Sequence, residues 1–199
     1  MPGERDPISA VRGTAESINF CLWITGLPGS GKSTIAAFLV RMLWDSGIET
    51  VTLNMDSLRP ILTPEPKYTE EERALVYRAL VLAAHLLVKE GKRSVIIDAT
   101  GNRRVYRDLA RRLIPEFAEV FVKCPLEVCQ DREAARRSSY VEQDLYGKAK
   151  TGRLKGGLPG VSAPYEVPNN PEVELASAVL DSRESAKRIM AYVQSRWLR

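Results

Sequence analysis

A glycine-rich segment near the start of the chain constrains its fold more than any other feature. Residues 26–34 read GLPGSGKST and fit the pattern G-x-x-x-x-G-K-[ST] at every fixed position. The apolar run FCLWI at 20–24 precedes this segment and is typical of a buried strand, whereas IAAFLV at 35–40 follows it and is typical of a helix. A strand, a glycine-rich loop and a helix in this order predict a P-loop.

The residue types of this loop suit an anion. Glycines permit backbone angles that side chains block, so successive amide N–H groups can face a phosphate at the start of a helix. We then expect Lys32 to reach the β- and γ-phosphates of ATP, and the Ser33 hydroxyl to ligate Mg²⁺. A flexible turn that matches by coincidence is the alternative, and the flanking strand and helix disfavour it. The predicted ATP-binding residues of the loop are Gly26, Gly29, Ser30, Gly31, Lys32, Ser33 and Thr34.

Composition excludes several classes of protein. The 199 residues, 44% hydrophobic and 27% charged, suit one α/β domain that needs no disulfide or metal staple. The net charge of +4 is mild, and the basic residues do not cluster as they do on nucleic-acid surfaces. The three cysteines are predicted to be reduced thiols. No apolar stretch approaches membrane-spanning length, and residues 1–17 lack the core of a signal peptide, so we expect a cytoplasmic protein without a membrane partner.

Strand-like and helix-like segments alternate along the chain. Further strands are predicted at 49–53, 94–98, 118–122 and 178–180. Further helices are predicted at 69–91, 103–114, 125–137 and 184–197. In the helix at 69–91, the apolar positions are predicted to be Leu75, Leu80, Leu82, Leu86 and Leu87. Pro60 predicts a break and a loop over 60–68, and the many glycines and prolines of 138–172 predict irregular structure.

This alternation predicts an α/β fold, a three-layer P-loop kinase sandwich with a five-stranded parallel sheet and helices on both faces. The predicted organisation is an N-terminal tail at 1–17 and one domain at 18–199, with a lid at about 130–172.

Two carboxylates are predicted to reach the P-loop, because ligands gather at the carboxyl ends of parallel strands. Asp56 follows the strand at 49–53, and Asp98 ends the strand at 94–98. Phosphoryl transfer needs cations around the phosphate and a carboxylate to orient the acceptor. With Lys32 as the catalytic cation, Asp56 is predicted to serve the acceptor and Asp98 the Mg²⁺ shell. A turn-forming or capping acid is the alternative for both.

Basic residues near these acids predict an anionic acceptor, because guanidinium groups bind phosphate or sulfate in bidentate fashion. The candidates for the acceptor site are Arg59, Arg73, Arg78 and Lys148, with Tyr68 placed to stack on a ring. The candidates for a lid over the ATP phosphates are Arg132, Arg136 and Arg137, and Lys148, Lys150 and Lys155 are candidates for the same lid. A solvated surface charge is the alternative for each of these cations.

Several of these segments resemble the adenylylsulfate kinase family. GLPGSGKST is similar to the family's P-loop, and LNMDSLR at 53–59 is similar to its L-D-G-D-x-x-R at the second Asp and the Arg. Residues 68–78 follow its F-S-x-x-D-R-x-x-N-I-R at several positions, Arg73 and Arg78 among them. Also similar in kind and order are CPLEVC at 124–129 with Arg132, LYGKA at 145–149, PYEVP at 164–168 and NPE at 170–172. The resemblance covers residues 20–180.

The resemblance implies the transfer of the γ-phosphoryl group of MgATP to the 3′-hydroxyl of adenosine 5′-phosphosulfate. It implies that Asp56 orients this hydroxyl and that Arg59, Arg73 and Arg78 hold the anionic groups of the acceptor. It also implies a homodimer.

The chain departs from the family pattern mainly on the acceptor side. The family's first Asp and its Asn are Asn54 and Val76 here, its F-I-S-P becomes ATGN at 99–102, and its K-x-F-T-G becomes KGGLPG at 155–160. A longer segment near 134–142 enlarges the predicted lid. A related P-loop kinase for a different small anionic nucleotide or sugar therefore remains an alternative. A nucleotide-dependent switch or binding module is a second alternative, disfavoured because core and lid take up nearly the whole chain.

Overall fold

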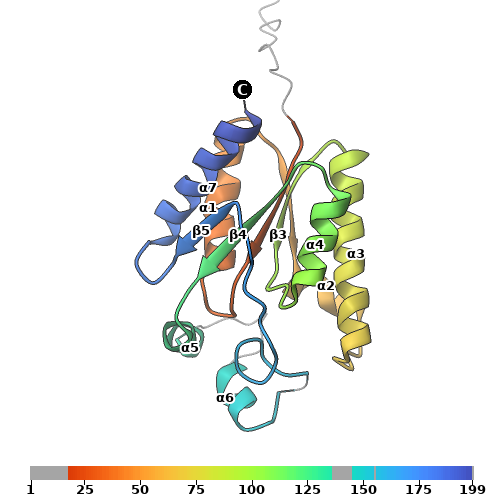
Figure 1. Cartoon of the computed structure of the whole chain (residues 1–199), viewed down its shortest axis with the longest axis vertical. Helices are drawn as coiled ribbons and strands as arrows, with labels where there is room; N and C mark the ends of the chain where they lie inside the picture. The colour runs from red at the N-terminus through yellow and green to blue at the C-terminus, as the bar shows by residue number, and fades with distance from the viewer. Residues whose placement is uncertain (1–17, 136–144, 155, 199) are drawn as a thin grey trace, which may run out of the picture.

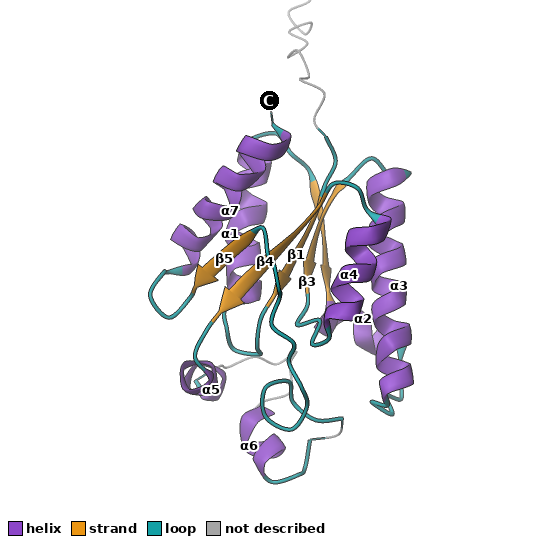
Figure 2. Cartoon of the chain, in the orientation of Figure 1, coloured by secondary structure: helices purple, strands orange, loops and turns teal. Residues whose placement is uncertain are grey.

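The computed structural model describes residues 18–135, 145–154 and 156–198. Within them, five strands form one parallel sheet in the order β2-β3-β1-β4-β5 (Figure 2). The strands are β1 Cys21–Thr25, β2 Thr50–Asn54, β3 Ser94–Asp98, β4 Phe117–Lys123 and β5 Val173–Ala176. The helices are α1 Lys32–Asp45, α2 Met55–Leu62, α3 Glu70–Lys89, α4 Arg104–Leu113, α5 Leu126–Ala134, α6 Leu145–Lys150 and α7 Ser182–Trp197.

Helices cover both faces of this sheet (Figure 1), which confirms the predicted α/β sandwich. The central strand β1 shows why, because its fully buried side chains alternate between two cores. Leu22 and Ile24 belong to the core that α1 and α7 complete, whereas Cys21 and Trp23 belong to the core under α3 and α4. A strand apolar on both faces needs a helical layer on each side.

The predicted break at Pro60 is wrong, because Pro60 lies inside α2. Asn54 caps this helix by accepting a hydrogen bond from the Ser57 backbone N–H at 3.0 Å. Proline lacks an N–H, so the helix loses the bond to the carbonyl of Asp56. The helix then ends within one turn, where the Thr63 N–H bonds to the Arg59 carbonyl at 2.8 Å. A surface helix of eight residues tolerates one missing bond.

The fifth strand also differs from its predicted position at 178–180. It lies at Val173–Ala176, where Leu175 pairs with Val122 of β4 and is fully buried. Residues 178–180 form a turn after it, closed by the Leu180 N–H bonding to the Ala176 carbonyl at 2.9 Å. Val179 is 85% exposed, so its β-branched side chain is no sign of a strand here.

The buried face of α3 differs from the predicted leucines as well. Leu80 is buried, but Leu75, Leu82 and Leu86 are 60%, 54% and 48% exposed. The buried stripe consists of Arg73, Val76, Tyr77, Leu80, Val81 and Ala84. It follows the helical period as a mixed set of residue types, so leucine identity alone does not mark the core face.

The predicted tail at 1–17 and parts of the predicted lid lie outside the described residues. Of the region expected to be irregular, residues 145–150 form the short helix α6. The three cysteines are free, as predicted. None of the helices that the structure describes combines the length and apolar character needed to cross a bilayer.

Candidate active site

The P-loop joins β1 to α1 at the carboxyl edge of the sheet. Gly29 and Gly31 have φ angles of 79° and 99°, in the left-handed region that favours glycine. A Cβ atom on Gly29 would lie 2.3 Å from the carbonyl oxygen of Cys129, so α5 packs directly against the loop backbone. Only glycine permits this close approach. The first backbone amides of α1 have no partner within the helix and can bind an anion.

Lys32 opens α1 beneath this loop and is only 9% exposed. Its Nζ donates to the carbonyl of Leu27 at 2.9 Å. Burial lowers the pKa of Lys32, and the negative charges of Asp98 and Asp56 act in the opposite direction. The two carboxylates therefore lie within electrostatic reach of this ammonium, as the positions of the strand ends predict.

A cavity of about 860 Å³ opens beside the P-loop. Most of the predicted site residues line it together: Gly29, Gly31, Lys32, Ser33, Thr34, Asp56, Arg59, Tyr68, Arg73, Asp98 and Arg132. The structure thus brings a phosphate-binding loop, two carboxylates and several guanidinium groups around one space.

Four predicted site residues do not line the cavity: Gly26, Ser30, Arg78 and Lys148. Gly26 lies behind the loop, where a Cβ atom would approach the Val122 carbonyl to 2.6 Å, and Ser30 is fully buried. Arg78 is exposed on α3. At about 100° per residue, the five positions that separate it from Arg73 turn its side chain well away from the cavity. The predicted binding roles of these four residues stay predictions.

Only some of the other lid candidates lie within the described residues. Lys148 and Lys150 lie on α6, and Lys148 is partly buried. Arg136, Arg137 and Lys155 fall outside the described residues.

Two arginines that line the cavity carry N–H groups that no hydrogen bond within the described residues satisfies. The Arg59 guanidinium lies 5.5 Å from the centre of the Tyr68 ring, and its buried Nη1 makes no hydrogen bond but lies 4.0 Å from the Glu72 carboxylate. Arg73 is 7% exposed, donates from Nη2 to the Gly156 carbonyl at 2.8 Å, and leaves Nε unpartnered. Buried donors without partners are costly, so this side of the cavity is prepared for an anionic ligand.

Arg132 and α6 complete the nucleotide side. Arg132 donates from Nη2 to the carbonyl of Ser177 at 2.7 Å, which holds the guanidinium at the end of β5. The hydroxyl of Tyr146 on α6 donates to the Pro28 carbonyl at 2.8 Å. The short helix is thereby tied to the P-loop itself.

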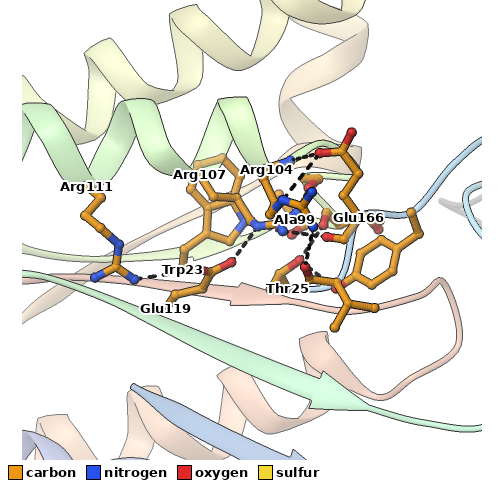
Figure 3. A network of polar contacts seen from close by, with 12 residues as sticks. Trp23, Thr25, Ala99, Arg104, Arg107, Arg111, Glu119 and Glu166 are labelled. Carbon is orange, nitrogen blue, oxygen red and sulfur yellow. Dashed lines mark hydrogen bonds and ion pairs between the residues drawn. The ribbon is translucent and has the colours of Figure 1, made fainter. Parts of the chain in front are cut away.

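A buried network behind the cavity is absent from the sequence predictions (Figure 3). The Arg107 guanidinium donates to the carboxylate of Glu119 and to the carbonyls of Gly101 and Glu166. Asn102 also donates from Nδ2 to the Pro164 carbonyl at 3.0 Å. These bonds join the 99–102 loop, which follows Asp98, to the segment 164–166.

The same segment reaches the end of β1. The hydroxyl oxygens of Tyr165 and Thr25 lie 3.1 Å apart, and Thr25 donates to the Thr100 carbonyl at 2.5 Å (Figure 3). Thr25 directly precedes the P-loop, so three segments distant in sequence are held as one unit. The unusual PYE sequence at 164–166 marks this place, but its partners cannot be read from local pattern.

Comparison with known proteins agrees with this geometry. The family model described as Adenylylsulphate kinase matches residues 18–176. The chain belongs to the adenylylsulfate kinase family. It is therefore a nucleotide-dependent kinase, a phosphotransferase with an alcohol acceptor, and the predicted family, fold class and enzyme class are confirmed.

Similar members of the adenylylsulfate kinase family come from bacteria and archaea. A probable adenylyl-sulfate kinase of Synechocystis sp. is 35% identical over 84% of this chain and 89% of its own length. A probable adenylyl-sulfate kinase of Archaeoglobus fulgidus is 37% identical over 78% of this chain and 94% of its own length. The APS kinase of Mycobacterium tuberculosis, solved in complex with AMPPNP and APS, superposes with a TM-score of 0.78 at 31% identity, covering 89% of this chain and 99% of that one.

Proposed function

We propose that this kinase acts on adenosine 5′-phosphosulfate, transferring the γ-phosphoryl group of MgATP to the 3′-hydroxyl and releasing 3′-phosphoadenylylsulfate and ADP. The observation that carries the proposal is the shared cavity in which the P-loop faces Asp56, Arg59 and Arg73. Donor phosphates and an anionic acceptor can therefore occupy adjoining parts of one space. Placing both reactants there converts a bimolecular step into an effectively unimolecular one.

The nucleotide side would bind ATP through backbone amides, Lys32 and Arg132. Lys32 would stabilise the charge that spreads over the transferring phosphoryl oxygens. Two oxygen donors that line the cavity, the Ser33 hydroxyl and the Asp98 carboxylate, fit Mg²⁺, which prefers oxygen ligands and few protein contacts. When bound, the metal neutralises phosphate charge.

The acceptor side would use Asp56 to orient the attacking hydroxyl and to accept its proton. Arg59 and Arg73 would hold the sulfate and phosphate oxygens, because each has a buried N–H group without a hydrogen bond within the described residues. Tyr68, whose ring lies beneath the Arg59 guanidinium, would stack on the adenine.

A different anionic nucleotide or sugar is the second candidate acceptor, and two positions favour it. Val76, where the family pattern has Asn, is 2% exposed and packs in the core below α3. Leu158 lines the cavity within the segment that replaces the family's aromatic residue. At position 158 a group that would stack on a base is lost, and position 76 contributes no side chain to the cavity, while the arginines remain.

We also propose bounds for the domain, an oligomeric state and a cellular compartment. Residues 18–199 would form the kinase domain, with the lid at about 130–172, and the family resemblance supports a homodimer. The free thiols of Cys21, Cys124 and Cys129 are consistent with a reducing compartment such as the cytoplasm.

ADP release from MgATP tests the proposal directly. We expect turnover with adenosine 5′-phosphosulfate, slower turnover with its base-altered analogue and none with a neutral nucleoside. Lys32→Ala should nearly abolish turnover while thermal unfolding stays close to wild type. Faster turnover with another anionic acceptor would favour the second candidate, and a fully active Lys32→Ala enzyme would overturn the site assignment.

A further inference from the structure

Asn54 and Asp98 end two neighbouring strands and meet at the edge of the cavity. They are register partners in the parallel pair of β2 and β3. The Asn54 amide donates from Nδ2 to Oδ2 of Asp98 at 2.7 Å. Asp98 is 4% exposed and lines the cavity. The contact therefore bears on the carboxylate that we assign to the metal and the nucleotide phosphates.

The remaining atoms of Asn54 fix the direction of this hydrogen bond. Its Oδ1 accepts from the backbone N–H of Ser57 at 3.0 Å and from the Ser57 hydroxyl at 3.3 Å, which caps α2. One side chain thus accepts on the α2 side and donates on the β3 side. An aspartate at this position could cap the helix but could not donate.

The hydrogen bond also determines what Asp98 presents to the cavity. With Oδ2 held by Asn54, the second carboxylate oxygen has no hydrogen bond within the described residues. Asp98 is also the carboxylate that acts most strongly on Lys32. The adenylylsulfate kinase pattern has an acid at position 54, and this chain has a neutral amide there with an acid directly across the strand pair.

We propose that Asn54 is a positioning residue which holds the Asp98 carboxylate toward the nucleotide phosphates and their metal. Positions 54 and 98 act as one unit that carries a single negative charge. The inference rests on the proposed function in that it assigns a role within the same nucleotide site. It goes further by predicting that the charge can be exchanged between the two strands.

Calorimetric titration with ADP, with and without Mg²⁺, tests the positioning role without any acceptor. Asn54→Ser keeps a hydroxyl that can cap α2 but is too short to reach Asp98. We expect this variant to lose about tenfold or more of the affinity gained on adding Mg²⁺, the range for a hydrogen bond to a charged group. Its affinity for metal-free ADP and its thermal unfolding should stay near wild type. An unchanged metal effect, or an equal loss without metal, would overturn the positioning role.

A double variant tests the exchange of the negative charge between positions 54 and 98. Asp98→Asn alone should abolish most of the Mg²⁺ effect on ADP affinity. The double variant Asn54→Asp/Asp98→Asn should restore a measurable part of it, because the acid at position 54 can cap α2 and accept from the amide at position 98. No restoration would overturn the single-charge unit. Glu49→Gln and Gln194→Glu make the same acid and amide changes at exposed positions outside the cavity and serve as controls. Should the wild type fail to use adenosine 5′-phosphosulfate, the proposed acceptor falls while these binding data still decide the inference.

Discussion

Arg107 and Glu119 form a buried ion pair below the active site, with Nε 2.5 Å from Oε1 and side chains 1% and 7% exposed. The other donors of this guanidinium go to backbone carbonyls of the 99–102 loop and of the segment 164–166. One side chain of α4 thus holds the 99–102 loop and the segment 164–166 together behind the site. The pair matters because both charges are almost entirely shielded from water.

Arg107→Met should therefore destabilise the fold strongly. Removing one partner of a buried pair typically costs about 3–5 kcal/mol, because it leaves the other charge uncompensated. Among the residues that the structure describes, Glu119 would retain Arg111 as its one cationic partner, at 3.6 Å. Chemical denaturation would measure the loss of unfolding free energy. Arg112→Met, an exposed change on the same helix, is the control, and equal stability of the two variants would contradict this account.

Gly156→Ala should impair acceptor use. A Cβ atom here would lie 2.2 Å from the Cβ of Tyr68, so either the ring or the lid must move. A misplacement of about 1 Å can cost 10²-fold, so we expect kcat/KM for the acceptor to fall at least about tenfold. Gly152→Ala is the matched control, because its φ of 68° is similar but nothing lies within 4 Å. Equal effects of both variants would assign the loss to backbone strain alone.

Asp56→Asn should separate chemistry from nucleotide binding. Asp56 lines the cavity in the first turn of α2 and is exposed, so its loss leaves no buried charge. We expect kcat to fall by roughly 10²-fold or more, the range for general-base contributions, with ATP affinity unchanged. Asp108→Asn, at an exposed position on α4, controls for the lost charge. A variant that loses ATP binding instead would make Asp56 a metal or structural residue.

Arg59→Ala should raise the acceptor KM by roughly ten- to a hundred-fold, since a hydrogen bond to a charged group contributes about 1.5–3 kcal/mol. Replacing the acceptor's base should cost less than this, because few groups in the cavity recognise a base. Steady-state kinetics with both acceptors would measure the two effects. Arg78→Ala removes the same charge from the exposed side of α3 and should leave KM close to wild type. Equal effects of the two substitutions would restore the three-arginine cluster expected from sequence.

Local pattern was sufficient for most of the fold. The strand Ser94–Asp98 has the predicted bounds. Thr69, where the helix at 69–91 is predicted to begin, caps α3 by accepting from the Glu72 N–H at 3.2 Å. Such features depend on neighbours within a few residues, which a sequence displays directly. The fifth strand was misplaced because its short segment becomes a strand only by pairing with β4.

The candidate site, like the fold, was predictable from sequence only in part. The P-loop and the convergence of Lys32, Asp56 and Asp98 follow from the sequence, because parallel strands bring their carboxyl ends to one edge. Only the tertiary structure decided that Arg73 faces the cavity while Arg78 does not, that Arg107 is buried against Glu119, and that Asn54 donates to Asp98. Those contacts depend on strand register and on helix rotation. Both are set by the packing of the whole core, which no short stretch of sequence contains.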